Sequence, residues 1–395
     1  MTASIMPTYA RYDLTFVRGD GPYIFDTNGT QYLDFGSGIA VNSVGHCHPH
    51  LVETLKKQAE TFWHCSNLYH IPNQNSLADR LINCSFPGSV FFNNSGAEAV
   101  ELAVKVARKF QSKKGEPGRY RVITIEGAFH GRSLAMLAAG RQAKHLDGFG
   151  PIVDGFDQVA FGDLKSIENA MTNETAAVII EPIQGEGGIR PMDFSYIQNL
   201  RKICDQNGVL LIVDEVQSGI GRTGKLFAYQ HAAVSPDIVS LAKGLGGGFP
   251  IGACIARSDV AASMGPGSHG STFGGNPLAT AVAGAVLDVI LAPGFLEHVR
   301  KISLLFLSEL ELLVSNYPML FSEVRGLGLM IGLKCNKNLE NGLFVKSLME
   351  KRLLTVPAGE NVIRLIPPLT IDEEHVVEAM EALNEASRIF VSEKR

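Results

Sequence analysis

The stretch LLIVDEVQSGIGRTG at residues 210–224, followed by PDIVSLAKGLGGGFPIGA at residues 236–253, decides the fold of this chain. Each half is a short apolar run followed by a side chain that can do chemistry, Asp214 in the first half and Lys243 in the second. Short apolar runs bounded by turn residues are typical of buried strands. Because ligands of open α/β sheets lie at the carboxyl ends of the strands, we expect Asp214 and Lys243 to meet in one crevice.

The same pattern continues on both sides of this stretch. Apolar runs that predict strands lie at residues 121–125, 177–180, 209–213, 238–241 and 253–256. Between them, apolar residues recur at helical spacing, for example over residues 100–110 and 197–204. Strands that alternate with helices predict an α/β fold with a mostly parallel central sheet.

The length of 395 residues is too great for one compact core and suits about two domains. The pattern changes at LAPG, residues 291–294. Beyond it we expect a helix over 295–314, a strand over 326–334, a helix over 339–352, a strand over 362–365 and a helix from residue 372. We predict a large domain over residues 51–292 and a smaller α+β domain over residues 293–395, to which residues 1–50 contribute.

Composition excludes several classes of protein. The net charge of −5 does not suit a nucleic-acid-binding protein, and no apolar run reaches the roughly 18 residues of a membrane span. Six widely spaced cysteines and the lack of a signal-peptide core predict a cytoplasmic protein. The sequence HCHPH at residues 46–50 raises the alternative of a metal site. Its spacing matches no zinc pattern, so we expect a polar turn before a helix near His50 and no metal.

Asp214 and Lys243 could form a structural ion pair, but their context suits pyridoxal 5′-phosphate. This cofactor needs a lysine for a Schiff base, a carboxylate to keep its pyridine nitrogen protonated, and a phosphate cradle. The sequence NSGAE at residues 94–98 opens a helix, where free N–H groups favour an anion. The run GLGGG at residues 244–248 is only a loose dinucleotide fingerprint, because it lacks the acidic residue about twenty positions on.

Taken together, these motifs resemble the class III (subgroup II) aminotransferases of fold type I, and within them the acetylornithine aminotransferases. Further matching motifs are GIAVN at 38–42, GHCHP at 45–49, SGAEA at 95–99, FHGR at 129–132, EPIQGE at 181–186 and GSTFGGNP at 270–277. The resemblance covers nearly the whole chain. It implies a large domain with a mostly parallel sheet, a smaller domain, and bound pyridoxal 5′-phosphate.

The resemblance also implies roles around the cofactor ring. Lys243 would hold the cofactor covalently and then move protons, for which burial and nearby positive charge must lower its pKa. Asp214 would pair with the pyridine nitrogen, and Gln217 would hydrogen-bond the ring hydroxyl. Phe129 would stack on the ring, although a lone phenylalanine is more often part of a core.

The phosphate group of the cofactor would be held by Ser95, Gly96 and Ala97 at the start of the helix. Thr272 would reach the phosphate in the neighbouring subunit. The resemblance therefore implies a homodimer with shared active sites.

The resemblance implies that charge selects the substrates. Arg132 would clamp a carboxylate common to both substrates, which is the α-carboxylate in an acylated ornithine, with Ser271 nearby. Glutamate has two carboxylates, so Arg364 would bind the second. Glu186 would neutralise Arg364 while the amino donor is bound. The alternative for Arg364 is a solvated arginine or a surface salt bridge.

The implied reaction moves the δ-amino group of N2-acetyl-L-ornithine to 2-oxoglutarate in arginine biosynthesis. Relatives that use free ornithine carry an aromatic residue near the position of Gly38, where the small residue would leave more room for an acylated amine. Tyr9 falls where these relatives have an N-terminal tyrosine. Alternative donors are ornithine, succinylornithine, succinyldiaminopimelate and 4-aminobutyrate. An aminomutase or a non-catalytic protein on the same fold also stays open.

Overall fold

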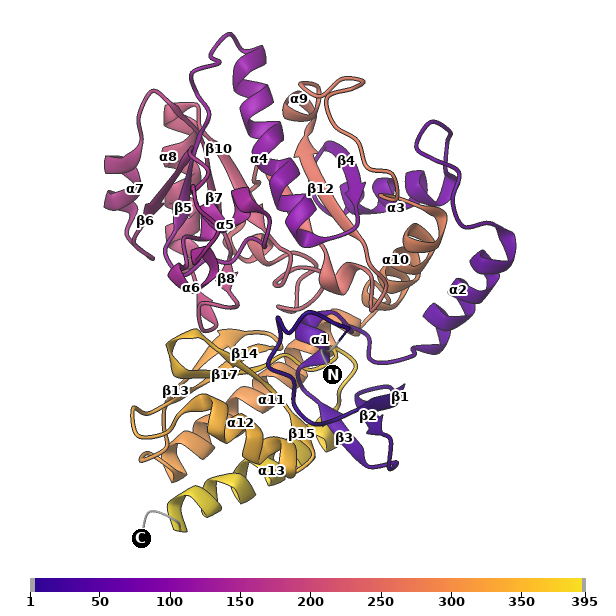
Figure 1. The fold of residues 1–395 in the computed structure, drawn as a ribbon, viewed down its shortest axis with the longest axis vertical. Helices are drawn as coiled ribbons and strands as arrows, with labels where there is room; N and C mark the ends of the chain where they lie inside the picture. Colours follow the sequence, from indigo (N-terminus) through magenta and orange to yellow (C-terminus); the bar gives the residue numbers. More distant parts are fainter. Residues whose placement is uncertain (1–3, 393–395) are drawn as a thin grey trace.

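The computed structural model describes residues 4–392, and a seven-stranded sheet forms the middle of its larger part, drawn in the upper half of Figure 1. In spatial order the strands are β4 (Gly88–Asn93), β12 (Gly252–Arg257), β11 (Ile238–Leu241), β10 (Leu210–Asp214), β7 (Thr175–Ile180), β5 (Arg121–Ile125) and β6 (Phe156–Val159). The strands from β11 to β6 pair in parallel, whereas β12 runs antiparallel to both of its neighbours. The predicted α/β fold with a mostly parallel sheet is confirmed, and each strand predicted for this sheet is present.

Helices cover both faces of this sheet, which explains why its strands are apolar throughout. Successive side chains of a strand point to opposite faces. Ile212 of β10 accordingly packs in the apolar cluster with α4 (Gly96–Lys113), and Val213 in the cluster with α8 (Phe194–Asn207). A strand buried on both faces needs apolar residues at every position, as the sequence pattern indicated.

Further helices surround the same sheet. In the described part of the chain they are α2 (Pro49–Thr61), α3 (Pro72–Asn83), α5 (Leu134–Gly140), α6 (Ala143–Leu146), α7 (Leu164–Ala170), α9 (Ser258–Ala261) and α10 (Pro277–Ile290). A two-stranded ribbon of β8 (Ile183–Gln184) and β9 (Arg190–Pro191) lies beside them. Within residues 4–392 no single helix has the length and apolar character to cross a membrane; only α10 with the following helix, bent by 69°, meets both criteria as a pair.

A second sheet is antiparallel and belongs to the last third of the chain, with the spatial order β13 (Phe321–Leu327), β14 (Met330–Cys335), β17 (Val362–Leu365) and β16 (Val356–Ala358). It is accompanied by α11 (Phe295–Asn316), α12 (Asn341–Glu350) and α13 (Glu373–Ser392) (Figure 1). The prediction of a single strand over residues 326–334 was wrong. Gly328 has a φ of 59°, and the chain reverses there between β13 and β14.

The first and last parts of the chain share a third sheet. Its strands are β1 (Phe16–Asp20), β2 (Tyr23–Asp26), β3 (Gln31–Asp34) and the short β15 (Leu353–Leu354), which pairs in parallel with β3. The short α1 (Ser37–Ala40) follows β3 and leads toward the central sheet. Phe35, just after β3, has its ring 5.5 Å from that of Phe306 in α11. Residues near both ends of the chain therefore pack into one body.

A buried arginine joins the loop after β10 to the antiparallel sheet. Arg222 lies in that loop and is 2% exposed. Its Nη1 donates hydrogen bonds to the carbonyl oxygens of Leu329, 3.0 Å away, and Pro367, 2.5 Å away. Burial without a carboxylate partner lowers the pKa of Arg222 to about 9. These bonds fix the hairpin of β13 and β14 against the central sheet.

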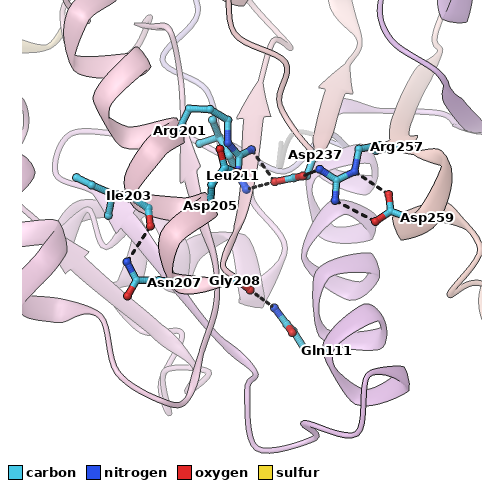
Figure 2. Close-up of polar contacts among 10 residues, drawn as sticks. All are labelled: Gln111, Arg201, Ile203, Asp205, Asn207, Gly208, Leu211, Asp237, Arg257 and Asp259. Atoms are coloured by element: carbon cyan, nitrogen blue, oxygen red, sulfur yellow. Dashed lines mark hydrogen bonds and ion pairs between the residues drawn. The ribbon is translucent and has the colours of Figure 1, made fainter.

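At the other ends of the central sheet's strands, away from the loop that contains Arg222, one buried aspartate links several elements, as Figure 2 shows. Asp237, just before β11, accepts the backbone N–H of Leu211 in β10 at 2.7 Å. It also pairs with Arg201 of α8 at 2.7 Å and with Arg257 of β12 at 2.5 Å. Arg257 in turn pairs with Asp259. A single carboxylate just before β11 thus links the strands on either side of it, β10 and β12, and a helix, at the edge away from the carboxyl ends of the parallel strands.

Candidate active site

A cavity of about 460 Å³ lies at the carboxyl ends of β4, β5, β7, β10 and β11. Loops that leave these strands supply its lining. Most of the predicted site residues are among the lining residues, which include Asn94, Ser95, Gly96, Ala97, Phe129, His130, Arg132, Glu181, Asp214, Gln217 and Lys243. The convergence expected of Asp214 and Lys243 on one crevice is therefore present in the structure.

Lys243 begins a short turn directly after β11, at the floor of this cavity. Its backbone has a φ of 44°, which is unusual for a residue other than glycine. Strain of this kind persists where the surrounding structure fixes a side chain for a function. Burial first, and then the positive charge of Arg364, lower the pKa of Lys243 despite the opposing carboxylates of Glu186 and Asp214. A lysine with a lowered pKa can act as a nucleophile and a base near neutral pH.

Asp214, at the end of β10, is oriented by two hydrogen bonds. The backbone N–H of Val216 donates to its Oδ1 at 3.0 Å, and His130 Nδ1 lies 2.7 Å from its Oδ2. Burial alone would lower the pKa of His130, but the hydrogen bond and the charges of Asp214 and Glu181 outweigh it and raise the pKa. The sequence analysis assigned no role to His130, although it lies in the motif FHGR at residues 129–132, because its partner is 84 positions away.

Glu181, directly after β7, adds a second carboxylate beside His130. It accepts the backbone N–H of Phe129 at 2.9 Å, so it also fixes the residue that comes before His130. Burial raises the pKa of Glu181 to about 7, with repulsion from Asp214 in the same direction and attraction by His130 against it. The sequence analysis assigned no role to Glu181, although it opens the motif EPIQGE at residues 181–186.

The loop between β4 and α4 forms a cradle for an anion. Ser95 caps α4, and its side chain accepts the N–H of Glu98 at 3.2 Å. The N–H groups of the first helical turn have no partner within the helix, so Gly96 and Ala97 can offer theirs to a phosphate. A side chain at Gly96 would meet Val216, since a Cβ there would lie 2.7 Å from Val216 Cγ1. Position 96 therefore requires glycine, because the loop after β4 and the loop after β10 approach each other closely there.

The side chains and N–H groups around this cavity are chemically suited to bind pyridoxal 5′-phosphate. The fit rests on an anion cradle at the start of α4, a buried carboxylate and a lysine of lowered pKa in one cavity. Phe129 contributes an aromatic ring to the same lining.

Arg364 of β17 is 1% exposed and comes from the antiparallel sheet; it does not line the cavity itself but contacts the lining residue Gln217. Its Nη1 donates to Glu186 Oε1 at 2.7 Å and to Gln217 Oε1 at 2.9 Å. Burial opposes ionisation of Glu186, but the charge and hydrogen bond of Arg364 outweigh it and lower the pKa of Glu186. Arg364 is thus held by an ion pair inside the molecule, and the alternative of a solvated arginine does not apply to the described structure. The bond from Arg364 to Gln217 was not anticipated.

Arg132 lies on the other side of the cavity, where its guanidinium carbon is 5.6 Å from the centre of the Phe129 ring. Its Nη2 lies 3.1 Å from Nε2 of His145 in α6. Among residues 4–392 no carboxylate forms an ion pair with Arg132, in contrast to Arg364. An arginine without a counterion at the wall of a cavity is suited to bind the carboxylate of a ligand.

The structure does not bring every predicted residue to the cavity. Ser271 lies close by, since Asn94 Nδ2 donates to its Oγ at 3.3 Å. Ser271, Glu186 and Arg364 lie near the cavity without lining it. Thr272 and Tyr9 are exposed and are not among the lining residues. The predicted contacts of both therefore stay predictions. Gly38 has a φ of 62°, so the backbone itself favours glycine at that position, whatever the size of the substrate.

Comparisons with known proteins agree with this arrangement. The family model described as aminotransferase class-III matches residues 6–387. An acetylornithine aminotransferase of Agrobacterium fabrum is 54% identical over 385 residues, which cover 98% of this chain and 96% of the relative. A crystal structure of the ornithine aminotransferase from Toxoplasma gondii has a TM-score of 0.95 at 33% identity and covers 99% and 94% of the two chains. The crystal structure of the N-acetylornithine aminotransferase from Stenotrophomonas maltophilia has a TM-score of 0.85 at 38% identity. The match covers 97% of this chain and 98% of that chain.

Proposed function

Because the chain belongs to the class-III aminotransferase family, we propose that it moves the δ-amino group of N2-acetyl-L-ornithine reversibly to 2-oxoglutarate. The products are N-acetyl-L-glutamate 5-semialdehyde and L-glutamate, and the reaction belongs to arginine biosynthesis. The observation that carries this proposal is the pair of arginines near Lys243: Arg132 lines the cavity, and Arg364 contacts its lining residue Gln217. Among the described residues Arg132 has no counterion, whereas Arg364 is neutralised by Glu186. Such a site can take a substrate with one carboxylate and then one with two.

The enzyme uses pyridoxal 5′-phosphate, which supplies an electron sink that lets the amino group leave the donor carbon. Lys243 would hold it covalently, and Asp214, oriented by His130, would face its ring nitrogen. Its phosphate would lie on the N–H groups of Gly96 and Ala97. Ser95, Phe129 and Gln217 would complete the binding site.

Donor and acceptor are distinguished by the charges that line the cavity. Arg132 would bind the α-carboxylate of acetylornithine, far from its δ-amino group, while the ion pair with Glu186 keeps Arg364 from attracting a second anion. Glutamate brings a carboxylate next to its amino group, and Arg364 would leave Glu186 to bind it. Lys243 Nζ, with its lowered pKa, would take the proton from the carbon that carries the amino group.

Timing each half-reaction separately tests the substrate. The reconstituted enzyme is mixed with excess N-acetylornithine, ornithine, succinylornithine, succinyldiaminopimelate, 4-aminobutyrate or glutamate, and the absorbance of the lysine-bound cofactor is followed. We expect fast loss with N-acetylornithine and glutamate and slow loss with ornithine. If ornithine or 4-aminobutyrate reacts fastest, the proposed donor is wrong and the family assignment stands. Ornithine is the stronger rival, because the T. gondii enzyme has the higher TM-score of the two structures, although its identity is lower.

We further propose a homodimer, because exposed aromatic side chains gather beside the loop that contains Thr272. Residues Phe62, Trp63, Tyr69 and Phe273 are exposed, and the His64 ring lies 5.4 Å from that of Phe273. Large exposed apolar clusters mark protein interfaces. Asn67 Nδ2 holds this segment against the loop by donating to the carbonyls of Ser271 and Gly274. The partner's cofactor would then lie within reach of Thr272.

The remaining proposals concern domains and compartment. The pairing of β3 with β15 supports a division in which residues 1–50 join residues 293–395 in the smaller domain and residues 51–292 form the larger. Each of the six cysteines is free in the described structure, which supports the cytoplasm as the compartment.

A further inference from the structure

His145 is the sole hydrogen-bond partner of the Arg132 guanidinium among residues 4–392, at 3.1 Å from Nε2 to Nη2. It belongs to α6, a single turn beside the cavity. One contact holds the His145 ring, and a second holds the start of its helix. The His145 ring and that of Phe129 form a T-shaped pair, with the ring centres 6.0 Å apart and an angle of 81° between the planes. The residue before α6, Gln142, donates to the carbonyl of Ala128 at 3.0 Å.

The chemistry of the two side chains fixes the direction of this hydrogen bond. A guanidinium has five donors and no acceptor and stays protonated in proteins. Nε2 of His145 must therefore accept, which requires the neutral ring with its proton on Nδ1. Burial, and then the charges of Arg132 and Lys144, lower the pKa of His145 and favour that neutral form, while Glu186 works in the opposite direction.

We propose that His145 is a positioning residue that holds Arg132 in the orientation in which its guanidinium binds the substrate carboxylate. The inference rests on the proposed function, since it presumes that Arg132 binds this carboxylate. Its physical basis is the cost of ordering a long side chain. An arginine with no other hydrogen-bond partner in the described chain samples more rotamers, and a ligand that fixes it loses affinity accordingly.

Two substitutions separate the acceptor from the ring. His145→Phe keeps an aromatic ring against Phe129 but removes the acceptor, and we expect KM for both N-acetylornithine and glutamate to rise about three- to tenfold. His145→Gln returns an acceptor oxygen and should restore KM to within about twofold of the parent. In both variants kcat and the melting temperature should stay near the parent values. His375→Phe, far from the cavity on α13, is the control for replacing a histidine that contacts an aromatic ring and a side chain.

A double-mutant cycle distinguishes positioning from a structural effect. If His145 acts through Arg132, then His145→Phe should change KM little in the Arg132→Ala background. Equal effects of His145→Phe in both backgrounds, or no effect in the parent, would overturn the inference. If Arg132→Ala itself leaves KM unchanged, the proposed substrate clamp is wrong, and the inference fails with it. The two failures are thus distinguished by the single variant at Arg132.

Discussion

Glu215 follows Asp214 in the chain but turns to a different set of partners behind the cavity. It accepts the N–H of Tyr229 at 2.8 Å and the hydroxyl of Ser218 at 2.9 Å, and it is 1% exposed. No cation forms an ion pair with it among the described residues. Burial raises its pKa from the ordinary 4.5 to about 7. The folded chain therefore binds this proton more tightly than the unfolded chain.

This raised pKa predicts how stability changes with pH. Between about pH 4.5 and 7 the folded state binds more protons at Glu215 than the unfolded state, so the free energy of unfolding falls as pH rises through that window. The variant Glu215→Gln should be more stable than the parent at pH 8, by on the order of 3 kcal/mol at most, with a difference near zero at pH 5. Denaturant unfolding at both pH values measures this. Glu311→Gln, at an exposed position of α11, is the control. A difference in the free energy of unfolding between Glu215→Gln and the parent that is equal at both pH values would contradict the prediction.

Arg364 carries a prediction about the two half-reactions. Arg364→Ala removes the charge that would bind the second carboxylate of glutamate, so its half-reaction should slow by roughly a hundredfold. The acetylornithine half-reaction should slow much less, because that donor would use Arg132. Stopped-flow absorbance of the cofactor measures both rates, with Arg132→Ala as the comparison that should impair both. Equal losses in Arg364→Ala would contradict the proposed switch.

At the scale of single residues, the sequence predicted Asp214 and Lys243 after their strands, but it missed Glu181 after β7 and the residues whose role depends on distant partners. Asp214 and Lys243 could be placed because each comes directly after an apolar run, and parallel strands end at the same edge. His130 could not be assigned a role, because its contact with Asp214 joins two strands separated by β7. The bond between Gln217 and Arg364 connects two different sheets, and no local pattern records it.

At the scale of elements, the buried Asp237 links β10, β12 and α8 and predicts a measurable loss of stability. Asp237→Asn leaves Arg201, which is largely buried, without its short ion pair and should cost roughly 3 kcal/mol. Asp259→Asn breaks only an exposed pair of Arg257 and should cost less than about 1 kcal/mol. Urea unfolding of both variants compares them. If Asp237→Asn lost no more stability than Asp259→Asn, the cluster in Figure 2 would contribute little to the free energy of unfolding.

Helices and strands were predicted well where the same spacing of apolar residues continues over a long segment. The helices α11 and α13 begin within one residue of their predicted starts, because apolar residues recur over many turns. The hairpin of β13 and β14 was missed because a two-residue turn at Gly328 interrupts an apolar run only briefly. Such a turn is recognised by its φ, which the amino-acid pattern alone does not reveal.

At the scale of the whole molecule, the exposed aromatic cluster predicts how two copies associate. Trp63→Glu should weaken the dimer, because a charge at the centre of an apolar interface must lose its water. Leu304→Glu on α11 is a matched control, since the two side chains are 64% and 68% exposed. Sedimentation velocity over a range of concentrations measures dissociation. Equal behaviour of the two variants would place the interface elsewhere.

The pairing of β3 with β15 sets the order in which a newly made chain can fold on the ribosome. Leu33 of β3 pairs with Leu353, which is synthesised roughly 300 residues later, or about 15–60 s at ordinary elongation rates. Until then Leu33 and Phe35, both buried in the finished molecule, lack the strand that accompanies them. The nascent chain must therefore keep its first strands unaggregated through almost its entire synthesis, which makes this early segment a site where a holding chaperone would act.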